Sequence, residues 1–177
     1  MTFRTLGIII GKKDFREHDK LFTLYTLERG KIQAMAQGCR KLSSKLAGNL
    51  ELLNIATFTI AQGKAIDRIA TVDIHHTNSD LKQNLEKLTC ALHCIEVFDQ
   101  CVKWDQADKE LFSHVCAFLQ SLTLAKDTMR AKISERFLAQ LGVLLGYGTD
   151  YTHALEHPLR SKEYYDFVAG RKNLQKS

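Results

Sequence analysis

The sequence predicts an α+β protein in which a small five-stranded barrel precedes an all-α helical region. Short runs rich in β-branched residues, separated by glycine-containing turn signals, occupy residues 3–74. From residue 79 onward, apolar residues recur every three or four positions, which is the period of an amphipathic helix. This change of period lies near residues 75–80, so we predict one domain over residues 1–76 and a second over residues 77–177.

Five strands are expected in the first part. The first is the apolar run Thr5–Ile10, which Gly11 is expected to end. The other four are expected at residues 21–26, 31–36, 52–61 and 65–74. Five short strands in about seventy residues fit a small closed barrel, and the OB-fold is the five-stranded barrel that commonly binds oligonucleotides.

Four helices are expected in the second part. Ser79 can cap the first, and its inward positions are Leu81, Leu85, Leu88, Leu92, Ile95 and Phe98. The second is expected from about Asp108 to Leu124, the third from about Asp127 to Gly146, and a short fourth from Ser161 to Gly170. Helices of this length and pattern make a scaffold with one buried face each.

Positive charge is concentrated in the predicted barrel. The formal net charge is +5, and residues 1–72 carry 12 Lys and Arg against 6 Asp and Glu, whereas residues 81–160 carry 9 against 10. A basic half beside a neutral half indicates one module that binds a polyanion and one that makes other contacts. The alternative is an ordinary solvated surface with a mild lysine bias.

The densest positive charge lies in residues 29–48, which hold five cationic side chains and no acidic one. A loop of Arg, Lys, Ser and Gly can approach a phosphate backbone and neutralise it without reading sequence. The predicted DNA-contacting residues are Lys12, Lys13, Arg16, Arg29, Lys31, Arg40, Lys41, Lys45, Lys64 and Arg68. In the first loop, Asp14, Glu17 and Asp19 could instead pair with Arg16 and Lys20 and leave a neutral surface.

Aromatic side chains are sparse in the barrel half. Phe22 and Phe58 lie in strands and are expected to fill the barrel, whereas Phe15 lies in a polar loop and is the better candidate for base stacking. No residue pattern reads base edges, so we expect charge to dominate and sequence preference to be small.

The sequence contains no recognisable catalytic or metal-binding constellation. It has no Gly-rich phosphate loop ending in Lys-Ser/Thr, no nucleophile elbow and no HExxH motif, which favours a non-enzymatic role. Cys90, His93, Cys94 and Cys101 suggest a metal site, but Cys90 and Cys94 are four apart on one helix with His93 beside them, and one helix cannot surround a zinc ion. We therefore interpret these residues as core residues and expect no cofactor.

The same chain carries no sign of export. Its five cysteines show no disulfide-framework spacing, no signal peptide is visible, and its uncharged runs are too short to span a bilayer. We therefore expect a protein of the cytoplasm, without membrane partners.

Several short motifs follow one another in a fixed order. They are Gly7–Ile10, Asp14–Lys20, Leu24–Lys31, Ala36–Lys41 and Ser44–Leu50, and in the helical half Arg136–Leu138, Leu144–Gly148 and Tyr151–His153. Together these motifs resemble the RecO family of bacterial recombinational-repair proteins, and the helical ones are similar to gammaproteobacterial members. Many members carry a four-cysteine zinc motif after the third helix, but this chain has no cysteine after Cys116 and so resembles the metal-free branch. The family is usually longer, so the helical domain is expected to be shortened.

The resemblance implies a function in DNA repair and recombination by the RecF pathway, in association with the nucleoid. Its implied partners are single- and double-stranded DNA, RecR and, indirectly, RecA, which would be loaded onto strands coated by single-stranded DNA-binding protein (SSB). It also implies annealing of complementary strands. The alternatives are a protein-interaction scaffold and an RNA-binding OB module.

The third predicted helix offers a candidate partner site. Arg130 and Arg136 lie near Phe137, and an apolar groove edged by cations could take an acidic peptide that ends in hydrophobic residues. The resemblance implies binding of the acidic C-terminal tail of SSB by the helical domain, and it assigns Arg136 to that contact. The alternative is an amphipathic helix with an ordinary basic outer face.

Overall fold

The computed structural model describes residues 1–39 and 48–147, which form two compact units. The first unit consists of Met1–Ser79 together with Lys103–Phe112, and the second begins with Asp80–Val102 and resumes at Ser113. The segment 103–112 therefore belongs with the barrel, although it lies between two helices in the sequence. The helix expected at Ser161–Gly170 falls outside the described residues.

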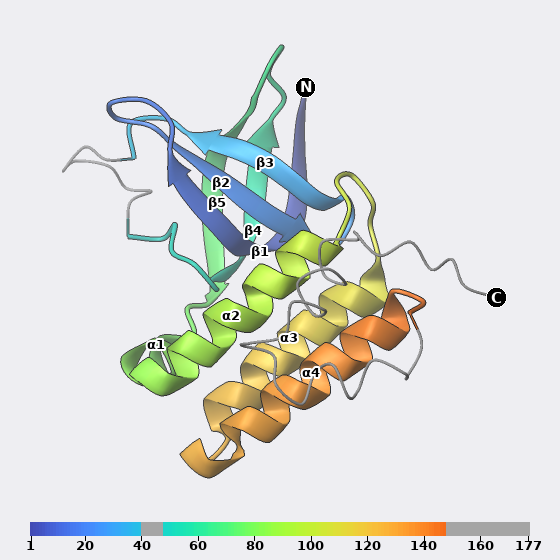
Figure 1. Cartoon of the computed structure of the whole chain (residues 1–177). Helices are drawn as coiled ribbons and strands as arrows, with labels where there is room; N and C mark the ends of the chain where they lie inside the picture. Colours follow the sequence, from blue (N-terminus) through green and yellow to red (C-terminus); the bar gives the residue numbers. More distant parts are fainter. Residues whose placement is uncertain (40–47, 148–177) are drawn as a thin grey trace. The chain divides into compact units, whose positions relative to one another are not determined.

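The first unit is a closed barrel of five strands (Figure 1). They are β1 (Thr2–Asp14), β2 (Lys20–Thr26), β3 (Gly30–Ala36), β4 (Ile55–Ala61) and β5 (Asp67–His76). The strand order is β1-β2-β3-β5-β4; β3 pairs with β5 in parallel and the other pairs are antiparallel. This order is that of an OB-fold, so the predicted five-stranded barrel followed by helices is confirmed.

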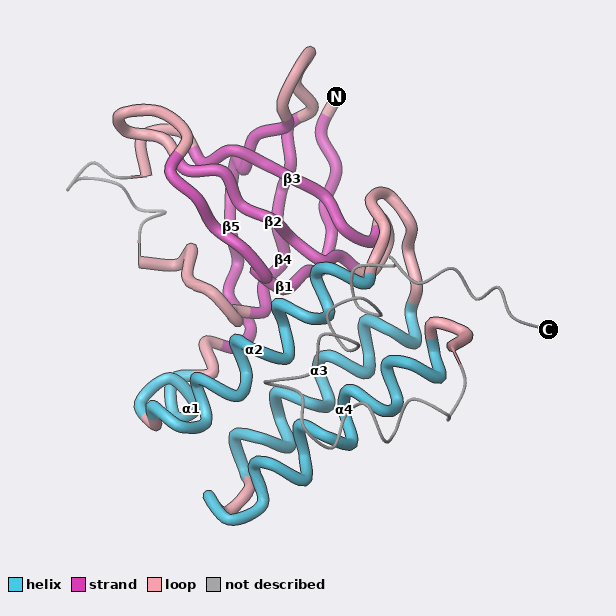
Figure 2. Tube along the Cα trace, in the orientation of Figure 1, coloured by secondary structure: helices cyan, strands magenta, loops and turns pink. Residues whose placement is uncertain are grey.

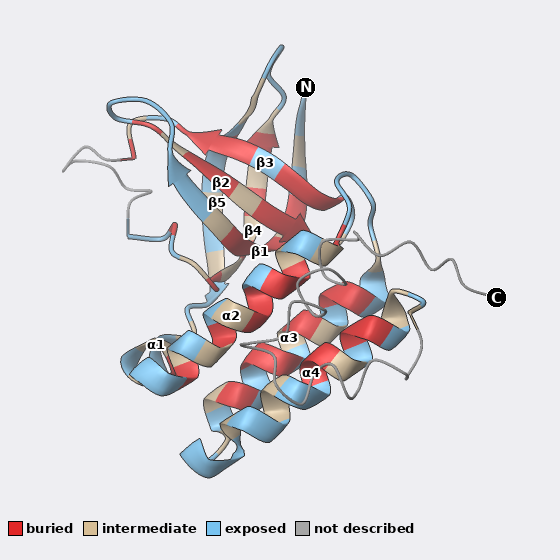
Figure 3. Cartoon of the chain, viewed as in Figure 1, coloured by how far each residue is buried: buried red, intermediate tan, exposed pale blue. Residues whose placement is uncertain are grey.

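The barrel is filled by alternate residues of its strands (Figure 3). In β4, for example, Ala56, Phe58 and Ile60 are fully buried while their neighbours are partly exposed. Phe22 and Phe58 are 1% and 0% exposed, which confirms that they fill the barrel and are not available for base stacking. Burying aromatic rings of this size is a dominant stabilising contribution in a small domain.

Strand β1 is longer than the sequence predicts. The register shifts between Ile9 and Gly11, and the strand then continues to pair with β2 as far as Asp14. Ile10 is therefore the extra residue of a bulge, and Gly11 pairs with Thr23 inside the strand and does not end it. As a consequence, Lys12 and Lys13 lie on the end of a strand, where the hairpin holds them, and not in the loop.

The helices are α1 (Ser79–Gln83), α2 (Leu85–Cys101), α3 (Lys109–Leu124) and α4 (Arg130–Leu144), with a short 3-10 turn at Asp127–Met129 (Figure 2). The single helix predicted from Ser79 is wrong, because Asn84 interrupts it with an extended backbone. The Asn84 side chain accepts a hydrogen bond from the Lys87 amide at 3.1 Å and starts a new helix. Leu85, which begins the new helix, is 76% exposed and Leu92 is 36% exposed, contrary to their predicted inward positions.

Two charged residues cap helix α3. At its start, an Asp108 carboxylate oxygen accepts from the amides of Glu110 and Leu111 at 2.9 and 3.0 Å. At its end, the buried Lys87 ammonium donates to the carbonyls of Thr123 and Ala125 at 3.1 and 2.6 Å. These bonds satisfy carbonyls that the end of a helix leaves unpaired. No helix in residues 1–39 and 48–147 has the length and apolar character needed to cross a bilayer.

Gly30 is fixed by its surroundings at the start of β3. Its φ is +68°, and a Cβ atom placed on it would lie 1.9 Å from the carbonyl oxygen of Gln106. We expect Gly30→Ala to lower the free energy of unfolding by about 2–4 kcal/mol, because it combines a left-handed backbone with overpacking. Urea unfolding would measure the change.

Gly48→Ala is the matched control for this substitution. A Cβ atom at Gly48 would meet no atom within 4 Å, so its effect should stay within about 1 kcal/mol. Equal losses for the two variants would contradict the close approach of Gln106 to Gly30.

Candidate nucleic-acid interface and helical groove

Three of the predicted DNA-contacting cations lie on the β1–β2 hairpin. Lys12, Lys13 and Arg16, which we call the hairpin cations, are all exposed. The Arg16 guanidinium lies 5.3 Å from the centre of the Phe15 ring, and Phe15 is 37% exposed. Phe15 is thus accessible as predicted, with a cation over its ring.

The hairpin is tied to the start of the basic loop, which we define as residues 37–48. An Asp19 carboxylate oxygen accepts a hydrogen bond from the Gly38 amide at 2.8 Å, and Asp19 is only 8% exposed. This bond holds the root of the basic loop beside the hairpin cations. Arg40, Lys41 and Lys45 themselves fall outside the described residues.

One cation beside the first loop, Lys20, has an acidic neighbour. The Lys20 ammonium lies 3.8 Å from an Asp14 carboxylate oxygen, so this charge is partly compensated. Asp19, in contrast, directs an oxygen to the Gly38 amide. An exposed ion pair of this length contributes little to stability, but it lowers the charge that Lys20 offers to a phosphate.

A second group of predicted cations lies around β3 and the β4–β5 hairpin. Arg29, Lys64 and Arg68 are exposed, and the Arg29 guanidinium lies 3.7 Å from the centre of the Phe3 ring. Lys31 differs from them, because it is 7% exposed and its ammonium lies 4.3 Å from the centre of the Trp104 ring. Its charge is covered, so we leave Lys31 out of the interface.

The segment 103–112 covers part of the surface on which OB barrels usually bind oligonucleotides, namely the face of β2 and β3. The Tyr25 ring is 1% exposed and stacks on Phe112 with ring centres 6.4 Å apart. Burial, assisted by the nearby Asp108 carboxylate, raises the pKa of Tyr25 to about 12. The accessible cations therefore belong to the loops and strand ends around this face.

Sequence reasoning missed the role of this segment, because it placed residues 108–112 in a helix and assigned residues 103–107 to no element. Trp104, 47% exposed, is the one tryptophan in the sequence and stands in a polar stretch. A large aromatic residue in such a stretch could have indicated that the segment packs against another part of the chain.

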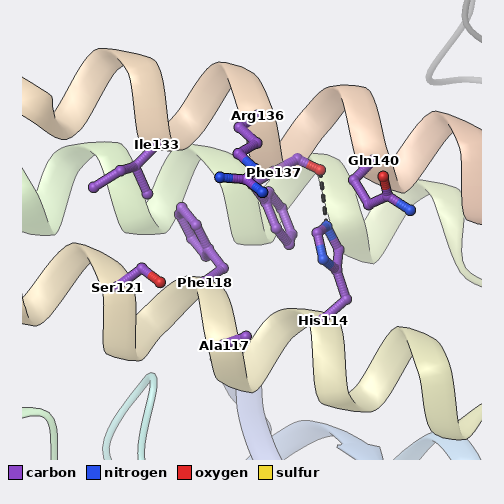
Figure 4. Close-up of a pocket in the computed structure, with 8 residues that line it drawn as sticks. All are labelled: His114, Ala117, Phe118, Ser121, Ile133, Arg136, Phe137 and Gln140. Carbon is purple, nitrogen blue, oxygen red and sulfur yellow. Dashed lines mark hydrogen bonds between the residues drawn. The ribbon is translucent and has the colours of Figure 1, made fainter.

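A groove of about 390 Å³ lies between α3 and α4 (Figure 4). It is lined by His114, Ala117, Phe118, Ser121, Ile133, Arg136, Phe137 and Gln140, and we call it the helical groove. Arg136 is exposed, whereas Phe137 is 2% exposed. The Phe137 ring stacks against His114 and Phe118, with ring centres 4.7 and 4.2 Å apart, so it forms part of the buried wall of the groove.

His114 is neutral in this setting. Its Nε2 lies 2.9 Å from the Phe137 carbonyl oxygen, and since a carbonyl only accepts, Nε2–H is the donor. Burial lowers the pKa of His114, although the hydrogen bond to Phe137 opposes this shift. Arg136 is therefore the cationic side chain among the residues that line the helical groove at neutral pH.

Arg130, the other predicted partner-binding cation, does not line the helical groove. Its guanidinium lies 2.8 Å from a Glu86 carboxylate oxygen and donates to the Asp127 carbonyl at 2.8 Å. Arg130 thus joins α4 to α2 and to the turn before α4. These contacts indicate a structural role for Arg130, and its part in partner binding stays a prediction.

The cysteines of α2 are packed as small apolar groups. Cys94 is 0% exposed, and burial raises the pKa of its thiol to about 12 and that of Cys101 to about 11. A metal ligand must be the thiolate, which these environments disfavour at neutral pH. In the described part of the chain, no three His, Cys, Asp or Glu side chains gather as a metal site.

The OB barrel with its exposed loop cations and the helices that follow it define a class of proteins built from two parts. Some members of this class bind nucleic acids. A family model described as "Recombination protein O N terminal" matches residues 1–78, and one described as "Recombination protein O C terminal" matches residues 82–170. The chain belongs to the RecO family.

Individual relatives agree with this assignment. "DNA repair protein RecO" of Acaryochloris marina is 34% identical over 128 residues, which are 71% of this chain and 44% of that protein. The protein of the same name from Desulforamulus reducens is 27% identical over 147 residues, which are 83% of this chain and 56% of that protein. The one from Synechocystis is 36% identical over 96 residues, which are 54% of this chain and 35% of that protein. The chain spans about half the length of the curated relatives it matches. These relatives are cyanobacterial and Firmicute proteins, so the family is confirmed and the gammaproteobacterial affiliation remains a prediction.

Proposed function

We propose that this chain is a DNA-binding mediator of recombination in DNA repair that anneals complementary strands and assists RecA loading onto SSB-coated single-stranded DNA. The observation that supports it best is the Asp19–Gly38 bond, which ties the hairpin that carries the exposed cations to Gly38, just before the cations of the basic loop in the sequence. A contiguous basic surface lowers the repulsion between two strands and lets them pair. The role is non-enzymatic.

In this proposal, contacts are made to phosphates. The interface comprises Lys12, Lys13, Arg16, Arg29, Arg40, Lys41, Lys45, Lys64 and Arg68. Long flexible cations positioned on hairpins and loops fix a strand by its backbone and carry little sequence information. Binding of both single- and double-stranded DNA follows from that mode of contact.

Salt titration tests the proposal. If five to six phosphates are neutralised on a single strand, the slope of log K against log salt concentration should be about −4, from roughly −0.7 per phosphate. Anisotropy of a labelled oligonucleotide between about 50 and 300 mM salt measures this slope. A slope near zero would favour a protein-interaction scaffold, and stronger binding of an RNA of matched sequence would favour an RNA-binding OB module.

The helical groove is the site that we propose for the acidic C-terminal tail of SSB. Arg136, exposed on the groove, would pair with an acidic or terminal carboxylate, and the apolar lining formed by Phe118 and Ile133 would receive a hydrophobic side chain. RecR and, indirectly, RecA are further proposed partners. We also propose that the chain acts in the cytoplasm at the nucleoid and belongs to the metal-free, gammaproteobacterial-like branch.

A further inference from the structure

A hollow of about 360 Å³ lies on the barrel unit between β3, the start of β5 and the segment that carries Trp104. We call it the Trp104 hollow; its lining includes Phe3, Arg29, Gln33, Asp67, Trp104 and Asp105. We propose that it binds one unstacked base of a single-stranded nucleic acid, with the Trp104 indole as the stacking surface. This inference rests on the proposed DNA binding and adds a base contact to it.

The Trp104 ring is held in place before any ligand binds. The Lys31 ammonium lies 4.3 Å from its ring centre, and the backbone of residue 31 pairs with that of residue 104. The next amide, that of Asp105, donates to the Lys31 carbonyl at 2.9 Å. Trp104 nevertheless remains 47% exposed. Because its ring is already held in place, stacking a base on it costs little conformational entropy.

Charge around the Trp104 hollow favours a base inside it and phosphates outside it. Asp67 and Asp105 line the hollow and would repel a phosphate, whereas carboxylates accept hydrogen bonds from the N–H groups of bases, the ring N3–H of thymine included. Gln33, also in the lining and exposed, offers both a donor and an acceptor. The same carboxylates disfavour the acidic tail proposed for the helical groove.

Cations lie in and beside the Trp104 hollow. Arg29 lines it, while Lys64 and Arg68 are exposed and adjoin the lining residues Ala65 and Asp67 in sequence. Aromatic rings combined with nearby cations are the arrangement by which proteins bind single strands, and stacking contributes most when the ring is accessible. A duplex keeps its bases stacked, so the hollow should act on single strands alone.

Intrinsic fluorescence provides the test, because Trp104 is the sole tryptophan of the chain. The full chain is titrated with oligothymidylate and with an abasic strand of the same phosphate number, at one salt concentration. We expect the base-containing strand to quench Trp104 fluorescence and to bind about tenfold more tightly than the abasic strand. Both Trp104 variants lack this fluorophore, so their affinities are measured by the anisotropy of labelled strands. Trp104→Ala should remove the difference between the two strands and leave abasic binding unchanged, while Trp104→Phe should retain part of it.

The outcomes separate this inference from the proposed function. Equal binding of both strands without quenching, together with a steep salt dependence, would overturn the base site and leave backbone binding intact. That result would also leave the Trp104 hollow as a surface for a protein partner. If neither strand binds, the proposed function itself fails. The comparison of the two strands on the unmodified protein stands even if Trp104→Ala proves unstable.

Discussion

Replacing Arg40, Lys41 and Lys45 together by alanine is expected to weaken binding of single-stranded DNA about 100-fold at 0.1 M salt. Each phosphate contact contributes roughly 0.7 to the salt slope, so three lost contacts remove about 2 log units of affinity at 0.1 M relative to 1 M salt. The slope of log K against log salt concentration should become shallower, changing from about −4 to about −2. Fluorescence anisotropy at several salt concentrations gives both numbers.

A matched variant distinguishes a local interface from a general effect of net charge. Lys109, Lys126 and Lys132 are exposed cations outside the barrel strands, and their replacement by alanine removes the same total charge. We expect that variant to bind within about twofold of the unmodified chain, because a solvent-exposed cation that contacts no phosphate is largely screened at 0.1 M salt. Equal losses for the two triple variants would contradict a DNA interface at the basic loop. A strand-annealing assay with the same proteins would extend the comparison to function.

The strands were predictable because their pattern is local. A half-buried strand alternates apolar and polar residues, and β4 shows that alternation in its sequence and in its burial. The extent of β1 was not predictable, because the pairing of Lys12 and Lys13 with β2 depends on a bulge at Ile10. Likewise, the break at Asn84 depends on a side-chain bond to Lys87, which competes with continuing the helix.

The accessibility of a candidate site residue was predictable where the polar character of its own segment determines it. It was not predictable where contacts with residues distant along the chain determine it. Lys12 and Arg16 are exposed, as the polar character of the first loop indicated. Lys31 looked equivalent to them in sequence, but a residue distant along the chain, Trp104, covers its ammonium. Arg130 also looked available until the position of Glu86 on another helix was known. Both residues have long-range partners, which no local sequence pattern contains.

Phe137→Ala is expected to lower the free energy of unfolding by about 3–5 kcal/mol, the largest effect of any single substitution considered. Phe137 is 2% exposed and stacks against both Phe118 and His114, so truncation leaves a cavity where three rings meet. The change should be measured by urea unfolding. It also means that Phe137→Ala cannot test the helical groove as a binding site, because loss of binding would follow from loss of structure.

Arg136 offers the cleaner test, because it is exposed and its removal should change stability by no more than about 0.5 kcal/mol. A charge-assisted hydrogen bond contributes about 1.5–3 kcal/mol, so Arg136→Ala should weaken an SSB-tail peptide about tenfold or more in a calorimetric titration. Lys132→Ala on the same helix is the control, because Lys132 is exposed but does not line the helical groove. If Lys132→Ala weakens the peptide as much as Arg136→Ala does, the basic outer face of α4 binds the tail by charge alone, and the helical groove has no specific role.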